Sequence, residues 1–212
     1  MPAEVAPPIG KGFYMLSVES DIAKAIAKLK SITEAQQLRF SVAKALTDTA
    51  KDVQAEVRKN MPQRFTLRRQ WVVQGIRFEK ATKETLTATI YSRDKFMGLQ
   101  ELGGPKSPLR QYLAIPTRAV RRTPKDIIKA ADKPKNLGDK AHVVEVKGHK
   151  YLALKKPRKG RSGNELRLLY LLVPRAQIKE RLGLNKDAQR IVRANFAGNL
   201  QRALEYAMRT AR

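Results

Sequence analysis

The feature that most constrains the fold is a long apolar repeat that runs from Thr33 to about Asn60. Polar and charged residues fill the positions between the apolar ones, which is typical of a helix with one buried face. The apolar positions, at steps of three or four, are Ala35, Leu38, Val42, Leu46, Ala50, Val53 and Val57. The pattern predicts an amphipathic helix of roughly 28 residues, about 40 Å long.

A second long amphipathic helix is predicted over residues 185–212, at the C-terminal end. Its apolar residues step by four along one face: Val192, Phe196, Leu200, Leu204 and Met208. A shorter helix is predicted over residues 21–30, where apolar residues fall at helical spacing. Three prolines and two glycines in residues 1–12 predict a flexible N-terminal arm without regular structure.

Between the long helices the sequence changes to short runs of β-forming residues. Residues 70–79 and 85–92 flank the sequence KATKE, which predicts a β-hairpin. Residues 142–148 and 150–156 predict a second hairpin with a short turn at Gly148 and His149. A further short strand is expected within residues 13–20.

The most hydrophobic run, Leu168 to Pro174, is seven residues long and uncharged. A membrane-spanning helix needs roughly 20 apolar residues, so this run is too short to be an anchor. Its apolar continuity predicts a central strand that is buried on both faces beneath the helices. Pro174 ends the strand because proline has no N–H to donate.

This order of elements predicts an α+β fold, because long helices bracket a set of antiparallel strands. We expect an antiparallel sheet packed against long amphipathic N-terminal and C-terminal helices, with extended loops. After the arm, residues 13–212 are expected to form a single domain. Segments rich in glycine, proline and basic residues predict long loops at about 101–140 and 155–165.

The charge of the chain limits its choice of partners. Lys and Arg number 44 against 19 Asp and Glu, which gives a net charge of +25. Such a charge must meet a negative partner or stay well solvated, so nucleic acid and acidic protein are the two candidates. The chain has no cysteine, which excludes disulfides, thiolate metal ligands and a cysteine nucleophile.

Two loops concentrate this positive charge and are the candidate surfaces for DNA or for an acidic partner. The first cluster consists of Lys155, Lys156, Arg158, Lys159 and Arg161, and the second of Arg118, Arg121, Arg122, Lys125 and Lys129. A third group, Arg64, Arg68 and Arg69, follows the long N-terminal helix. Few aromatic residues accompany these clusters, so we expect phosphate contacts rather than base stacking.

The residues needed for catalysis are sparse, and we predict that the protein is not an enzyme. Both histidines, His142 and His149, fall in one predicted hairpin, and Asp126 and Asp132 are isolated carboxylates. Acid–base and metal chemistry usually need histidines or clustered carboxylates. We therefore expect no catalytic residue, no metal site and no cofactor.

Three segments resemble the tail completion or minor tail proteins of tailed phages, the neck proteins typified by lambda minor tail protein Z. They are ALTDTAKDVQAEVRKNMP (45–62), LQELGGPKSPLRQYLAIPT (99–117), and LRLLYLLVPRAQIKERLGL (166–184) followed by FAGNLQRAL. The matches are patterns of apolar and turn residues and include no catalytic signature. The resemblance implies a structural protein without enzymatic activity.

The resemblance further implies a virion protein of the neck, assembled in the host cytoplasm. Such proteins form rings, commonly hexamers, around the DNA channel and contact the tail terminator and the head-side connector. Genomic DNA passes through the ring with non-specific contacts, and no membrane is involved. The segment expected to reach neighbouring subunits or ring partners contains Tyr112, Leu113, Ile115 and Pro116.

Two other functions fit parts of the sequence. A monomeric, sequence-independent nucleic-acid-binding protein would explain the charge, and its affinity would fall steeply with salt. A metal-dependent nuclease would need converging carboxylates, and its cleavage would be abolished by a chelator. The neck protein is the preferred hypothesis because it alone accounts for the order of the elements.

Overall fold

The computed structural model describes residues 15–18, 32–157 and 164–210. The chain divides into two compact units. The first, the helical unit, runs up to Gly103 and resumes at Lys179, and the second, the β unit, is Gly104–Ile178. We expected a single domain over residues 13–212. The structure differs because the two units have separate hydrophobic clusters. The expected arm (1–12) and the expected short helix (21–30) lie outside the described residues.

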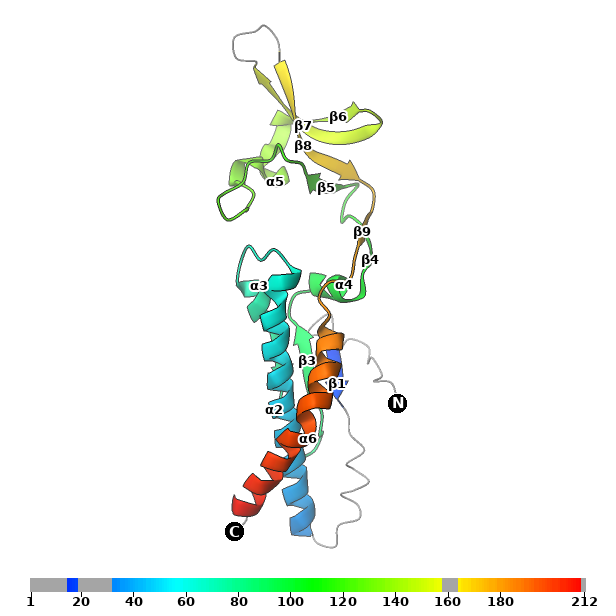
Figure 1. Ribbon diagram of the computed structural model, residues 1–212. Helices are drawn as coiled ribbons and strands as arrows, with labels where there is room; N and C mark the ends of the chain where they lie inside the picture. The colour runs from blue at the N-terminus through cyan, green and yellow to red at the C-terminus, as the bar shows by residue number, and fades with distance from the viewer. Residues whose placement is uncertain (1–14, 19–31, 158–163, 211–212) are drawn as a thin grey trace. The chain divides into compact units, whose positions relative to one another are not determined.

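Two long helices form the helical unit, as the apolar repeats predict. Helix α2 is Ile32–Arg64 and helix α6 is Leu184–Thr210, and they lie side by side (Figure 1). Helix α2 continues past the expected end at Asn60. Met61 explains the extension, since its side chain is fully buried in the helical core.

The buried face of α6 differs from the stripe seen in the sequence. The residues that it buries are Leu184, Asp187, Ala188, Asn199, Ala203 and Ala207, whereas Met208 is 71% exposed. A step of four residues turns a helix by about 40° more than one full turn. A stripe of repeated four-residue steps therefore rotates off the contact face, so Val192 lies against the core and Met208 does not.

Polar side chains within the α2–α6 contact fix how the two helices align. The Asn199 Nδ2 donates to Thr49 Oγ1 at 2.9 Å and to Asp52 Oδ2 at 3.1 Å. The Asn195 Nδ2 donates to the same Asp52 oxygen at 2.9 Å. Thr49 and Asn199 are both buried, so sliding one helix along the other would leave polar groups without partners.

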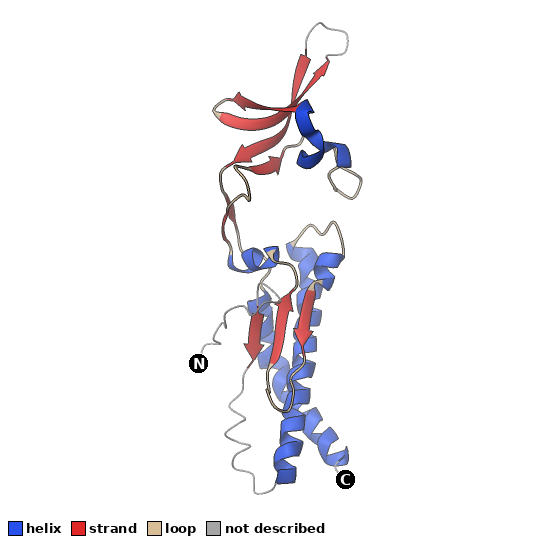
Figure 2. Ribbon diagram, turned by 180° about the vertical axis from the view of Figure 1, so that it is seen from behind, coloured by secondary structure: helices blue, strands red, loops and turns tan. Residues whose placement is uncertain are grey.

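A three-stranded antiparallel sheet packs against α2, which confirms the predicted α+β arrangement. Its strands are β1 (Met15–Val18), β2 (Ile76–Glu79) and β3 (Ala88–Ser92), in the order β1-β3-β2. Figure 2 shows the sheet lying along one side of the helices. Strands β2 and β3 form the predicted hairpin, in which Phe78 lies opposite Ile90.

The expected strand over residues 70–79 is wrong in its first half. Trp71–Gln74 is a single helical turn, α3, and only Ile76–Glu79 is a strand. Val72 and Val73 both pack against the helical core, which a turn of helix allows and an alternating strand does not. Gly75 follows because a Cβ there would lie 2.4 Å from Asp94 Oδ2.

The β unit contains a four-stranded antiparallel sheet in the order β5-β8-β7-β6. Its strands are β5 (Leu113–Pro116), β6 (Ala141–Val146), β7 (His149–Pro157) and β8 (Asn164–Val173). Short elements interrupt the loop expected at 101–140: β4 (Gly104–Lys106), β5, η1 (Ala130–Asp132), α5 (Pro134–Leu137) and η2 (Gly138–Lys140). Strands β7 and β8 likewise extend into both ends of the loop expected at 155–165. Residues 113–116 form a strand because they pair with β8. The many glycines and prolines around them had predicted a loop.

Strand β8 is central, as predicted, since it pairs with β5 on one side and β7 on the other. The expected position beneath the helices and burial on both faces are wrong, because β8 belongs to the β unit and most of its residues are exposed or half-buried. Its buried residues, Leu169 and Tyr170, pack with Val120 and Leu137 in the cluster of the β unit. Leu169 is the extra residue of a bulge, because the pairing passes from Tyr170 to Leu168 across consecutive residues of β7.

The second predicted hairpin is confirmed, with its turn one residue earlier than expected. Val146 lies opposite His149, and Lys147 and Gly148 form the two-residue turn. Both have positive φ, 53° and 74°, as a type I′ hairpin turn requires.

The chain leaves and re-enters the helical unit at one polar junction, which we call the clasp: Arg64, Glu101 and Asp187. Helix α4 (Phe96–Leu102) carries Glu101, whose carboxylate accepts from the backbone N–H groups of Leu184 at 2.8 Å and Asn185 at 2.9 Å. Arg64 donates to both Asp187 oxygens, at 2.7 and 2.9 Å. The clasp thus joins the end of α2, α4 and the start of α6. Strands β4 and β9 (Ala176–Ile178) pair just beyond it, in the β unit.

We predict that Glu101→Ala lowers the free energy of unfolding by about 2 kcal/mol, because two backbone N–H groups lose their acceptors. Glu101→Gln keeps one acceptor oxygen and should lose about half as much. Denaturant unfolding measures both. Glu205→Ala, at an exposed site on α6, is the matched control and should change stability by less than about 0.5 kcal/mol. Equal effects of Glu101→Ala and Glu205→Ala would contradict the capping role.

Candidate functional site

The β unit carries more than half of the net positive charge of the chain. Residues 104–178 hold 19 Lys and Arg against 5 Asp and Glu, a net charge of +14 out of the total of +25. These residues are about a third of the chain. The charge that the sequence shows as a bulk property is therefore concentrated on one compact unit, and this unit is the candidate site.

One carboxylate in the β unit is buried and binds two of its arginines. The Asp132 side chain is fully buried, and it accepts from the Arg121 backbone N–H and from Arg121 Nη2, both at 2.7 Å. Arg167 Nη2 donates to it at 3.0 Å. The hydrogen bonds from Arg121 hold the pKa of Asp132 at about 2, despite the burial that opposes ionisation. The Tyr170 hydroxyl donates to the Asp132 backbone carbonyl at 2.6 Å.

The second predicted cluster is therefore divided between internal and outer roles. Arg121 is engaged with Asp132, and Arg122 pairs with Asp126 at 3.1 Å. Arg118 is exposed, as are Lys125 and Lys129. Within residues 118–122, the structure thus leaves Arg118 as the cation best placed to meet an outside phosphate or carboxylate.

The structure brings this segment beside the first predicted cluster. Arg167, on β8, lies opposite Leu154 of β7, and its guanidinium donates to the Ala119 carbonyl, with Nε at 3.0 Å. Lys155 and Lys156 follow Leu154 and are both exposed. The second cluster, far away in the sequence, thus lies near the end of β7 that carries Lys155 and Lys156. Arg158, Lys159 and Arg161 lie outside the described residues.

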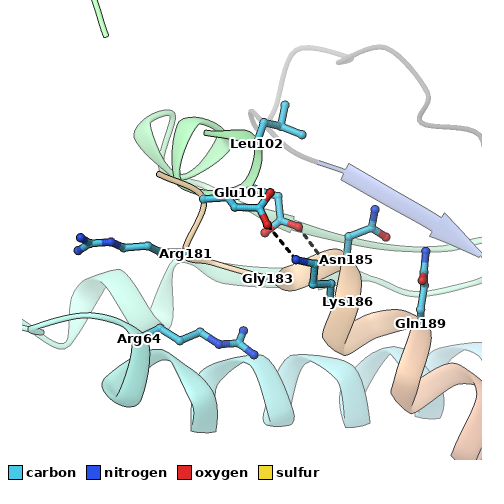
Figure 3. Close-up of a pocket in the computed structure, with 9 residues that line it drawn as sticks. Arg64, Glu101, Leu102, Arg181, Gly183, Asn185, Lys186 and Gln189 are labelled. Carbon is cyan, nitrogen blue, oxygen red and sulfur yellow. Dashed lines mark hydrogen bonds and ion pairs between the residues drawn. The ribbon is translucent and has the colours of Figure 1, made fainter. Parts of the chain in front are cut away.

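The third basic group belongs to the helical unit. Arg64 is part of the clasp and pairs with Asp187. A pocket of about 510 Å³ adjoins the clasp (Figure 3), lined in part by Glu101, Glu180 and Lys186. Lys186 pairs with Glu180 at 2.8 Å and Glu101 caps α6. Because Glu101, Glu180 and Lys186 already have partners within the helical unit, we interpret this pocket as part of the structural junction.

The predicted subunit-interface segment is an edge strand. Tyr112 precedes β5, and its hydroxyl accepts from Lys150 Nζ at 3.2 Å. Leu113, Ile115 and Pro116 belong to β5, which among the described strands pairs with β8 alone. Ile115 is 40% exposed. The segment is thus accessible to a neighbour, which is the position that its predicted role requires.

Sequence reasoning missed an exposed aromatic pair in the helical unit. Trp71 and Phe96 are 49% and 47% exposed, and their rings meet edge to face with centroids 6.1 Å apart. Exposed Trp is rare on a surface without a partner and is common at interface hot spots. This pair was missed because Trp71 was placed in a strand over residues 70–79, where no contact with Phe96 was expected. The proximity of Trp71 to Arg68 and Arg69 was the available signal.

The described residues show no cluster suited to a metal. No group of three or more His, Cys, Asp or Glu side chains converges within the ranges that the structure describes. His142 and His149 lie on β6 and β7 and are exposed. Across the same ranges, no helix is long and apolar enough to cross a membrane.

Comparisons with other proteins match one family. The sequence model of a family described as "Family of unknown function (DUF6441)" matches residues 15–167. No curated protein and no solved structure matches the chain. The charge and surface of the β unit are therefore the basis for any functional argument.

We predict that Asp132→Asn destabilises the β unit by about 2 kcal/mol at neutral pH. Because folding lowers the pKa of Asp132 from 3.8 to about 2, its contribution is complete above pH 5 and is lost as pH falls towards 2. Amide hydrogen exchange in β8, followed against pH, measures this. The exposed Asp139→Asn is the matched control. A difference from the native chain that persists undiminished at pH 2 would contradict the assignment.

Proposed function

The chain belongs to the family of unknown function DUF6441, and on that premise we propose that it is a structural virion protein of the phage neck. In this proposal it completes the head-proximal end of the tail as a subunit of a ring, commonly a hexamer, around the DNA channel. Its partners are the tail terminator, the head-side connector and, through non-specific contacts, the genomic DNA. The role includes no catalytic step, metal or cofactor.

The observation that carries the proposal is the concentration of charge on the β unit. A net charge of +14 on Gly104–Ile178 requires a polyanion or an acidic protein surface nearby. Around a ring axis the same charge repeats with every subunit, so neutralisation by the partner becomes a condition of assembly. A connector between DNA-filled head and tail meets that condition.

The segments that resemble neck proteins also form the framework of this structure. Residues 45–62 lie within α2, and residues 99–117 include Glu101 of the clasp and strand β5. Residues 166–184 span most of β8 and the start of α6. A resemblance in framework positions supports a shared architecture, with the partner-facing surfaces of the β unit adapted to this chain.

Within the proposal, the exposed cations and the edge strand have separate roles. Arg118, Lys155 and Lys156 meet phosphates or acidic side chains, while Arg121 supports the fold through Asp132. Strand β5, at the sheet edge, faces an adjoining ring partner.

We predict that particles carrying a peptide tag in the exposed Lys147–Gly148 turn bind gold-labelled antibody at the head–tail junction. Negative-stain microscopy of purified virions measures the position of the gold, with untagged particles as control. Particles made without the chain should separate into filled heads and free tails. Label at the tail tip, or normal joining in the absence of the chain, would contradict the neck role.

The same charge favours a second candidate function, a monomeric protein that binds nucleic acid without sequence preference. For that function, the isolated chain should bind duplex DNA with an affinity that falls steeply with salt. Replacing Arg118, Lys155 and Lys156 by Gln should make the slope of log K against log[salt] shallower by about 0.9 per lost contact. Fluorescence anisotropy measures the slope, and Lys59→Gln on α2 is the control. Equal slopes for the triple variant and the control would exclude these contacts.

A further inference from the structure

Among the described residues, one face of the four-stranded sheet in the β unit is covered and the other is not. Leu152, Leu154 and Tyr170 lie on the covered face, where they pack with Val120 and Leu137. Side chains alternate between the faces along a strand, and residues directly opposite each other in neighbouring strands share a face. The register therefore assigns the alternate residues to the other face, which we call the outward face.

A row of apolar side chains crosses the outward face from one edge strand to the other (Figure 1 shows the sheet). Ile115 of β5 lies opposite Leu171 of β8. Leu171 also lies opposite Tyr151 of β7, and Tyr151 lies opposite Val144 of β6. Alternation and pairing add further apolar residues on both sides of this row: Leu113, Val146, Leu166, Leu168 and Val173.

These side chains form an apolar surface that the described part of the chain leaves open. Ile115 is 40% exposed and Leu166 is 46% exposed, and the other members are half-buried. None of them belongs to either hydrophobic cluster of the described residues. A contiguous apolar patch of this kind on a highly charged protein marks an interaction site.

The charge around the outward face selects the kind of partner. None of the described strand residues on the outward face is acidic. Lys155 lies on this same face, where it pairs with Leu166. The acidic residues of these strands, Glu145 and Glu165, fall on the covered face through their pairing with Lys150 and Lys156. A partner with carboxylates around an apolar centre would complement this surface.

The same apolar surface and charge disfavour two other occupants of this face, a second copy of the chain and nucleic acid. A second copy of the β unit would bring another +14 charge to the contact, and repulsion would oppose the pairing. Nucleic acid would find aliphatic side chains where it needs cations or stacking rings, since Tyr151 is the one aromatic residue of the row. An acidic protein is the occupant that satisfies both the apolar surface and the charge.

We infer that the outward face docks a partner protein whose contact surface is apolar at its centre and rimmed by Asp and Glu. The row from Ile115 to Val144 supplies the buried centre, and Lys155 supplies a charged contact at the rim. This inference rests on the proposed function only in expecting the partner to be another neck protein. The surface chemistry stands without it.

Photo-cross-linking in particle-producing cells tests the inference. The full chain carries benzoylphenylalanine in place of Ile115 or, separately, of Leu166. The matched control places it at Val143, which is 61% exposed and lies opposite Leu152, on the other face of the sheet. We expect both outward-face positions to cross-link to one protein, and mass spectrometry to map the contact to an apolar peptide flanked by carboxylates. Val143 should not yield that product.

Binding of the purified partner then measures the contribution of the face. Ile115→Lys and Leu166→Lys should each weaken the affinity at least about tenfold, whereas Val143→Lys should change it by less than about twofold. Circular dichroism and the melting temperature confirm that each variant is folded. Two exposed sites are used so that the loss of fold in one variant leaves the other as a test.

Several outcomes would overturn the inference: cross-links to a second copy of this chain, to DNA or to residues 1–31 of the same chain, or no cross-link at either outward-face position. The gold-labelling experiment separates this failure from that of the neck role. Label away from the neck together with an acidic cross-linked partner would refute the proposed function alone. Label at the neck with cross-links only between copies would refute the docking inference alone.

Discussion

The Glu101 carboxylate closes the point at which the chain leaves the helical unit and returns to it. Its two oxygens accept from the first backbone N–H groups of α6, where the helix dipole also favours a negative charge. Arg64, at the end of α2, pairs with Asp187 in the first turn of α6. Without the clasp, the β unit would remain covalently attached, but the helices would lose the contact that aligns them at the point of insertion.

A strongly basic chain must use some of its cations internally and leave the rest exposed, and this protein separates the two uses. Arg121 and Arg167 converge on the buried Asp132, so the core of the β unit contains a compensated carboxylate. Lys155, Lys156 and Arg118 stay at the surface. The separation means that the outer cations can change partner without disturbing the fold, which suits a protein that assembles with others.

The sequence predicted elements whose apolar period is regular and local. The long helices α2 and α6, both hairpins and the central position of β8 follow from such patterns. The helical turn α3, the division into two units and the clasp depend on contacts between residues distant in the sequence: Glu101 reaches residues 184 and 185, and Val120 packs against Leu169. The exposure of Lys155 and Lys156 could be predicted from the basic sequence around them. The ion pair of Arg121 with Asp132 could not, because it depends on the burial of Asp132. The Trp71–Phe96 pair depends on the same long-range placement of α3 beside α4.

We propose that this chain is a structural component of a phage neck, present in the finished particle as part of a ring. Quantitative mass spectrometry of purified virions, with labelled peptides of this chain and of the major capsid protein as standards, measures its copy number directly. We expect a constant stoichiometry of about six copies per particle, as for one cyclic ring. Infectious particles that contain none of the chain would contradict it.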